Sequence, residues 1–340
     1  MEKILTIVVP TYNMEKYLER CLSSLLISDK EAFNTLEVLV VNDGSKDNSS
    51  TIAHSFQDKY PEVFTTIDKE NGNYGSCINV ALKIAKGKYI KILDADDCFN
   101  KLEFERFLTF LYRTDCDLIL TDYEEVDLNR QAIKEHNFHF CMDTSISLES
   151  LLDIELQMHS ITWKTRNLRS MGYYQTEGIS YTDSEWGYFP LFTVKAISYF
   201  SCMLYKYTVG RIGQTMDKSV YYNNMWHNIK GLESMLLWYS NQVWADDIVH
   251  HVLKSKLLSR ASSIYATYLI YGHNVLNISE LKKLDSMLAT EYTEIYHSLD
   301  ECTAPIKLFK IPFIKDWHRN NCLGKVRLKI IRAIKYLFHN

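Results

Sequence analysis

The sequence lacks the features that mark several classes of protein. Its eight cysteines are scattered, and no two of them have C-x-x-C spacing, which argues against a zinc site and a disulfide framework. No segment reaches the roughly 18 consecutive apolar residues of a membrane-spanning helix, and the N-terminus has no basic region followed by a long apolar stretch. We therefore predict a cytoplasmic protein with reduced cysteines, either free or at the inner face of the cell membrane.

An excess of basic charge is also missing. The formal net charge is −4 at pH 7, and the isoelectric point is near 6.3. A nucleic-acid binder usually carries a global positive field, so this balance argues against nucleic acid as a partner. The 340 residues are enough to bury a large core, in two domains or in one domain with a long extension.

Short apolar strands alternate with amphipathic helices through the first third of the chain. The pattern predicts strands at 4–9, 36–41, 63–67, 89–93 and 118–121, and helices at 18–25, 49–60, 76–86 and 103–113. Such alternation predicts an α/β fold with a mainly parallel sheet, helices on both faces, and ligands at the carboxyl ends of the strands. No element could be placed between 122 and 160, whereas the apolar spacing from 221 to 299 is helical.

Three carboxylates crowd the loop after the strand predicted at 89–93. Asp94, Asp96 and Asp97 lie within four residues of one another. A hard divalent ion such as Mg²⁺ or Mn²⁺ offsets their repulsion and keeps open positions for phosphate oxygens, so it could neutralise a departing nucleotide diphosphate. The alternative is an acidic helix start, but the position directly after a strand favours the metal site.

Polar residues also follow the other predicted strands. Asp43, in a turn after the second strand, can accept a hydrogen bond from a base N–H, and Tyr12 can stack on that base. Capping of the next helix is the alternative for this turn. Residues 71–75 supply flexible backbone beside a helix N-terminus, where amides can meet phosphates.

Together these segments resemble family 2 glycosyltransferases of bacterial surface-polysaccharide pathways. The resemblance rests on four motifs in the family's order: PTYN at 10–13, NDGS at 42–45, the helix start at 75–79 and LDADD at 93–97. It covers about the first 120 residues. It implies the nucleotide-sugar-binding fold called GT-A, a UDP-sugar as the favoured donor, and inversion at the anomeric carbon.

The resemblance also assigns roles to matching positions. Tyr12 would stack on the base, Asp43 would bind it, Asp94 would lie near the ribose or donor sugar, and Asp96 would hold the metal. The predicted metal ligands are Asp96 and Asp94. The complete set of predicted donor-binding residues is Pro10, Tyr12, Asp43, Asn73, Asp94, Ala95 and Arg211.

Inversion requires a general base that deprotonates the acceptor hydroxyl. The family places this base in a Glu-Asp pair well past the metal motif, and Asp183 aligns with it, while Thr182 departs from the usual Glu. Glu185 is a second candidate for the base. The alternative role for Asp183 is to cap the helix that follows.

Other segments extend the resemblance. The stretch around Arg211 is similar to a Gly-Arg-x-Gly-Gln motif, and Arg211 would either close over the donor diphosphate or pair with an acid of the protein. Trp163 and Lys164 are assigned to the acceptor wall by the same resemblance. The eleven histidines show no metal-ligand spacing, so structural or surface roles are expected for them.

These inferences predict a GT-A domain at 1–215, with a nucleotide-binding half at 1–122 and an acceptor half at 123–215. A helical region at 216–340 follows it and ends in a basic amphipathic tail at 306–340. This tail either lies on an anionic membrane or packs on the core with a solvated basic face.

The predicted function is metal-dependent transfer of a hexose or N-acetylhexosamine from a nucleotide-sugar to a glycan or lipid-linked saccharide. A homodimer is left open. The alternative is a non-catalytic nucleotide-sugar-binding module, against which the intact carboxylates argue. A dinucleotide oxidoreductase is excluded because the first strand-to-helix turn lacks G-x-G-x-x-G.

Overall fold

The computed structural model describes residues 2–141, 146–211, 214, 217–272, 275–303 and 312–320. The chain forms two compact units, Met1–Asp217 and Lys218–Asn340. Within the described ranges, no helix has the length and apolar character needed to cross a membrane.

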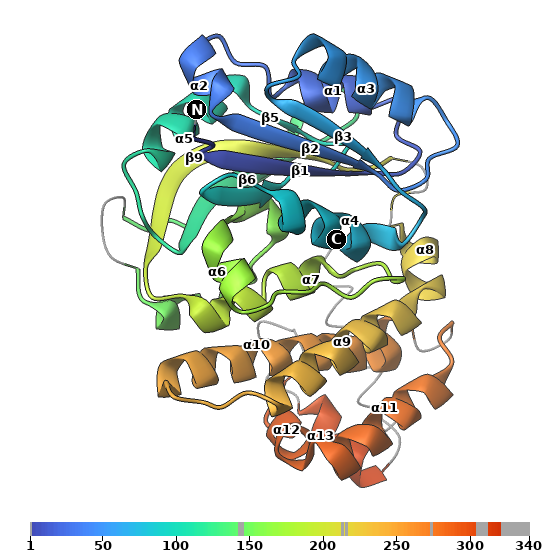
Figure 1. The fold of residues 1–340 in the computed structure, drawn as a ribbon. Helices are drawn as coiled ribbons and strands as arrows, with labels where there is room; N and C mark the ends of the chain where they lie inside the picture. Colours follow the sequence, from blue (N-terminus) through green and yellow to red (C-terminus); the bar gives the residue numbers. More distant parts are fainter. Residues whose placement is uncertain are drawn as a thin grey trace. The chain divides into compact units, whose positions relative to one another are not determined.

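A sheet of nine described strands forms the centre of the N-terminal unit (Figure 1). Its order is β3-β2-β1-β4-β8-β6-β9-β5, and β7 pairs with β6. The first four positions are parallel: β3 (Phe64–Asp68), β2 (Leu36–Asn42), β1 (Leu5–Thr11) and β4 (Tyr89–Ile92). The other half is mixed, with β8 (Ile161–Lys164), β6 (Leu118–Val126), β9 (Ile197–Thr208), β5 (Cys98–Phe99) and β7 (Ala132–His136). The predicted α/β class is confirmed.

Helices cover both faces of the parallel half. Every residue of β1 and β2 is buried, as expected for parallel strands whose crossover connections place helices on both sides. Figure 1 shows α3 on one side of these strands and α4 on the other. The helices of this half are α1 (Leu18–Ser23), α2 (Lys30–Asn34), α3 (Ser49–Lys59), α4 (Asn73–Ile84) and α5 (Lys101–Leu111).

The segment 122–160, where no element could be placed from sequence, contains the long end of β6, the strand β7 and two of the short helices given below. Asp122 and Glu124 are buried in β6, where they pair with Tyr199 and Lys206 of β9. These cross-strand polar pairs interrupt the apolar pattern, so only the first four residues of this strand were predicted. The short elements that follow are η1 (Leu148–Leu151), η2 (Met158–Ser160), α6 (Thr165–Ser170), α7 (Asp183–Trp186) and η3 (Phe189–Thr193).

The C-terminal unit is helical over its described residues. Its elements are α8 (Lys218–Asn223), α9 (Met225–Ser240), α10 (Asp247–Ala266), the π-helical η4 (Thr267–Tyr271), α11 (Ile278–Glu291), α12 (Thr293–Leu299) and α13 (Phe313–Asn320). The predicted apolar stripe of α9 is buried, which confirms it: Leu232, Met235, Leu236 and Tyr239.

The predicted basic tail is described only in α13. There Phe313, Ile314 and Trp317 are buried, and the Trp317 indole N–H donates to Asp285 of α11 at 3.1 Å. Over α13 the apolar side chains therefore pack on the protein. The rest of the tail, 306–311 and 321–340, lies outside the described residues, so its contact with a membrane stays a prediction.

Candidate active site

The polar residues that follow the parallel strands meet at one edge of the sheet. The Asp43 amide donates to the carbonyl oxygen of Thr11 at 2.8 Å, and the Lys69 amide donates to that of Asn42 at 3.0 Å, which joins the ends of β1, β2 and β3. The Leu93 amide donates to Val8, which places the carboxylate loop beside β1. The convergence predicted from strand order is therefore present.

A cavity of about 570 Å³ opens at the ends of β1, β2 and β3. Its lining comes from three loops: Tyr12, Asn42, Gly44, Lys46, Asp68, Lys69, Glu70 and Asn71. Tyr12 is 47% exposed at this edge, so its ring is accessible to a ligand in the cavity. Pro10 is buried within β1 and shapes the strand end rather than the cavity.

Asp43 is buried beside this cavity and held from several sides. Its Oδ1 accepts from the Lys69 ammonium at 2.5 Å and from the Gly72 amide at 2.9 Å. The Asn71 side chain donates to the Asp43 carbonyl oxygen at 3.0 Å. These bonds fix the carboxylate, and Oδ2 has no hydrogen-bond partner among the described residues.

The start of α4 connects the cavity to the carboxylate loop. Asn73, its first residue, has a left-handed φ of 64°, which turns the chain into the helix three residues before the predicted start. The Tyr74 hydroxyl donates to Asp94 Oδ1 at 2.9 Å. The start of α4 therefore follows directly on the loop that holds Asp43 and contributes a hydrogen bond to a predicted metal ligand.

The three carboxylates of the loop differ in their partners. Asp96 Oδ2 accepts from Arg211 Nε at 2.9 Å, so Arg211 pairs with an acid, one of the two roles expected for it. Asp97 accepts from the Tyr205 hydroxyl at 2.7 Å and from the Thr208 amide at 2.6 Å. Ala95 is buried between them.

Burial and mutual repulsion raise the pKa of two of these carboxyl groups. The pKa of Asp94 rises to about 8, first because of burial and then because of the charge of Asp96. Burial and then the charges of Asp96 and Asp94 raise the pKa of Asp97 well above its usual range. A cation would relieve this repulsion, so the donor set fits the predicted divalent ion.

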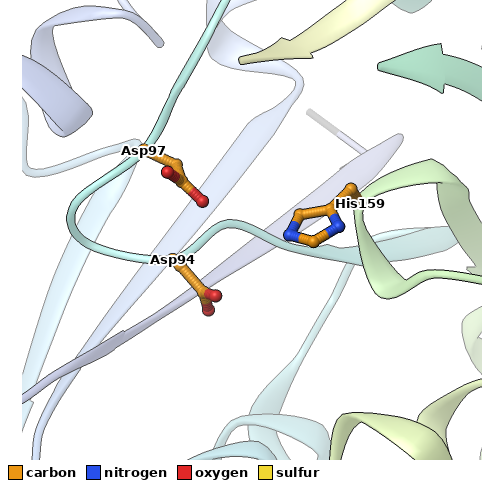
Figure 2. A group of neighbouring side chains, drawn as sticks. All are labelled: Asp94, Asp97 and His159. Carbon is orange, nitrogen blue, oxygen red and sulfur yellow. The ribbon is translucent and has the colours of Figure 1, made fainter. Parts of the chain in front are cut away.

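His159, from η2, completes this group (Figure 2). Its imidazole and the carboxylates of Asp94 and Asp97 have possible ligand atoms within 4.8 Å of one another. Burial and the nearby Lys91 lower the pKa of His159 to about 3, so the ring is neutral. The sequence contains no sign of a histidine beside the carboxylate loop, because a residue so far along the chain from that loop leaves no spacing pattern.

Asp183 is the first residue of α7 and is half-buried. Thr182, not Asp183, occupies the N-cap position, and no side-chain capping bond is present there, which removes the capping alternative for Asp183. The charge of Asp183 contributes to the raised pKa values of Asp94 and Tyr74, so it lies in the same electrostatic environment.

Glu185, the second candidate base, has structural partners. It is fully buried, and its two carboxylate oxygens accept from the amide and the hydroxyl of Thr176, each at 2.7 Å. Gln175 donates to both the carbonyl and the hydroxyl oxygen of Thr182. Hydrogen bonds at Thr182 and Glu185 therefore hold the chain in place on both sides of Asp183.

The expectation that Trp163 and Lys164 form an acceptor wall is wrong. Both belong to β8, where they pair with Ile90 and Tyr89 at the start of β4, the end of that strand opposite the carboxylate loop. Both side chains are buried, and Lys164 pairs with Asp115 at 2.8 Å. The antiparallel direction of β8, which the local pattern did not predict, explains the error.

Comparison with known proteins identifies the class of this site. Residues 6–174 match glycosyl transferase family 2, a range that includes the cavity, the carboxylate loop and His159. The chain therefore carries a domain that belongs to glycosyl transferase family 2. Curated relatives are 30–40% identical over the matched segments, and the chain spans less than half the length of each.

Three known proteins illustrate the similarity. The minor teichoic acid biosynthesis protein GgaB of Bacillus subtilis is 30% identical over 158 residues, which are 46% of this chain and 17% of GgaB. The structure of S. aureus TarS 1-349 with UDP-GlcNAc has a TM-score of 0.64 at 19% identity, and the match covers 95% of this chain and 93% of TarS.

The mannosyltransferase PcManGT of Pyrobaculum calidifontis, solved with GDP-Man and Mn²⁺, has a TM-score of 0.50 at 15% identity over 100% of this chain and 88% of that chain. At these identities the two structures establish the fold, and the predicted GT-A class with C-terminal helices is confirmed.

Proposed function

We propose that this chain is an inverting glycosyltransferase that takes a sugar from a UDP-sugar. The acceptor would be a glycan or a lipid-linked saccharide of bacterial capsule, exopolysaccharide or cell-wall glycan synthesis. The observation that carries the proposal is the meeting of the Asp43 cavity, the carboxylate loop and Asp183 in one unit. The similarity to GgaB supports the acceptor class, and the UDP-GlcNAc complex of TarS supports the donor class.

In this proposal the donor base occupies the cavity beside Tyr12. The exposed Tyr12 ring stacks on the base, and the free Oδ2 of Asp43 accepts a base N–H. The backbone at Asn73 would face the diphosphate, and Arg211, which pairs with Asp96 at 2.9 Å beside the carboxylate loop, would provide a cation for phosphate oxygens. Pro10 and Ala95 support this site through the backbone of their loops.

The residues proposed to hold a divalent cation are Asp94 and Asp96. A bound Mg²⁺ or Mn²⁺ would supply charge that stabilises the departing diphosphate. The raised pKa of Asp94, caused in part by Asp96, supports this assignment. EDTA should abolish transfer and Mn²⁺ or Mg²⁺ should restore it; full activity of Asp96→Ala in the presence of chelator would exclude the assignment.

Asp183 is proposed as the base that removes the proton of the acceptor hydroxyl. It lies outside the nucleotide cavity yet shares the electrostatic environment of Asp94, as an acceptor-side base should. Glu185 is less suited, because both of its oxygens already accept from Thr176.

The decisive experiment compares Asp183→Asn with Asp43→Ala. Asp183→Asn keeps the shape and removes the basicity, so transfer should slow roughly 10²-fold to 10⁴-fold while calorimetric UDP affinity is retained. Asp43→Ala should weaken UDP binding itself. Wild-type transfer by Asp183→Asn would remove its role as the base. UDP binding by a wild-type chain that transfers no sugar to any acceptor tested would favour the non-catalytic alternative.

A further inference from the structure

We propose that His159 is a nitrogen ligand of the divalent cation at the carboxylate loop and that it makes this site prefer Mn²⁺ to Mg²⁺. The inference rests on the proposed function, because it concerns the same cation. It adds a ligand from η2, an element distant in sequence from the Asp94–Asp97 loop.

The first argument is the arrangement of the side chains. Figure 2 shows the imidazole edge of His159 directed toward the carboxylates of Asp94 and Asp97, with the three groups around a common space. Their ligand atoms lie within 4.8 Å of one another. Ligands bound to one ion at about 2.1 Å lie roughly 3 Å apart when adjacent and about 4.2 Å apart when opposite. A small closure of these side chains would therefore suffice.

The second argument is an unsatisfied polar atom. His159 is 9% exposed, and its Nδ1 is buried without a hydrogen-bond partner. Neither ring nitrogen has a hydrogen bond to any of the described residues. Buried polar atoms in proteins are nearly always satisfied, so an imidazole with none points to a group that the protein alone does not supply. A ligated nitrogen on one side and a water on the other would satisfy both ring atoms.

The third argument is that the ring is rigidly held. The Lys91 ammonium donates to the His159 carbonyl oxygen at 2.7 Å and to that of Ile161 at 3.1 Å, which fixes the backbone on both sides of Ser160. The ring packs against Tyr205 and Tyr207, with centroids 4.7 Å and 4.4 Å away. An imidazole that is already held in one orientation needs little rearrangement to bind a metal ion.

The donor set then determines which cation is favoured. Carboxylates alone suit Mg²⁺ and Mn²⁺ alike, whereas imidazole is a good ligand for first-row transition metals and a poor one for Mg²⁺. Asp97 can still take part, because a carboxylate oxygen that accepts one hydrogen bond keeps a second lone pair. Two or three oxygens with one nitrogen therefore favour Mn²⁺.

Pulsed electron paramagnetic resonance of Mn²⁺ bound to the full chain with UDP tests this inference directly. A ligated imidazole gives a ¹⁴N coupling, and protein labelled with ¹⁵N-histidine should replace it by a ¹⁵N coupling. The wild-type measurement needs no variant. Mn²⁺ bound without histidine-nitrogen coupling would overturn the His159 inference and leave the metal-dependent transferase proposal intact, whereas absence of Mn²⁺ binding would count against the metal site itself.

Two variants assign the coupling to one residue. His159→Phe keeps an aromatic ring among the tyrosines and removes both nitrogens, so the coupling should disappear and Mn²⁺ affinity should fall at least about tenfold. Mg²⁺ affinity should change much less, which would reduce the selectivity by the same factor. If the Phe variant folds poorly, His159→Gln replaces it in the experiment. This variant keeps polar atoms at the position and should also abolish the histidine coupling.

The matched control is His136→Phe. His136 also stacks on a tyrosine, Tyr123, at 4.3 Å and bonds to Glu125, but it is not part of the three-residue group. This variant should keep the coupling and the Mn²⁺ affinity. Loss of the coupling in His136→Phe together with its retention in His159→Phe would refute the assignment.

Discussion

Lys91 should make the free energy of unfolding depend on pH, and the substitution Lys91→Met should remove this dependence. It lies in β4 with no exposed surface, and its ammonium donates only to backbone carbonyl oxygens among the described residues. Burial lowers its pKa from 10.5 to about 7. The folded state therefore holds this proton less tightly than the unfolded state does.

The sign and size of the effect follow from this difference. A lysine whose pKa is lowered on folding destabilises the fold fully below about pH 7, and the penalty is relieved as the pH rises toward 10.5. Lowering the pKa from 10.5 to about 7 corresponds to a loss of about 5 kcal/mol in the free energy of unfolding while the lysine stays charged in both states. Between pH 7 and pH 9 the relief amounts to about 2 kcal/mol.

Urea unfolding of wild type and Lys91→Met at pH 7, 8 and 9 measures this relief. Other groups that titrate in this range are present in both proteins, so they cancel in the difference between the two free energies of unfolding. The wild type should gain about 2 kcal/mol relative to Lys91→Met from pH 7 to pH 9. Parallel pH profiles, with a difference that stays constant within about 0.5 kcal/mol, would refute a titrating buried lysine.

Further predictions concern the segment before α7, the contact of α4 and the tail. Glu185→Gln keeps an acceptor for Thr176 and should lower the free energy of unfolding in urea by under about 1 kcal/mol. Glu185→Leu removes two hydrogen bonds and should lower it by about 2–5 kcal/mol. Equal losses in the two variants would contradict the role of these bonds. Gly75→Ala places a Cβ 2.1 Å from the Thr176 carbonyl oxygen and should lower the transfer rate at least about tenfold. The control Gly231→Ala places its Cβ in open space and should leave the rate unchanged. Equal transfer rates in the two variants would refute the importance of the contact between α4 and Thr176. Removal of residues 321–340, which carry five Lys or Arg, should release the protein from anionic vesicles, and salt should weaken binding of the intact chain. Salt-insensitive binding by the truncated chain would exclude the tail as the anchor.

Local pattern predicted the parallel half of the sheet and the position of its polar loops. Strands such as β1 and β2 are continuous apolar segments, and helices follow them at regular spacing, so strand order alone placed Asp43 and Asp94 at one edge. No tertiary contact was needed for that step.

The second half of the site depends on contacts that local sequence does not encode. His159 reaches the carboxylates because β8 runs antiparallel to β4, and Arg211 reaches Asp96 because β9 ends beside the same loop. The direction of β8 was the missing information, and it also explains the incorrect placement of Lys164. The roles of the individual residues in donor binding and catalysis stay predictions.

The contact between Asn79 and Gln175 has a consequence for protein engineering. Asn79 of α4 donates to the Gln175 carbonyl oxygen and accepts from the Gln175 amide, both at 2.8 Å, so one side chain pairs with the backbone as a neighbouring strand would. A chimera joined near residue 122, with a second half grafted from a relative that prefers another acceptor, would lose this pairing unless the grafted segment matched α4. An exchange of the proposed acceptor half should therefore include α4 together with the segment that it holds.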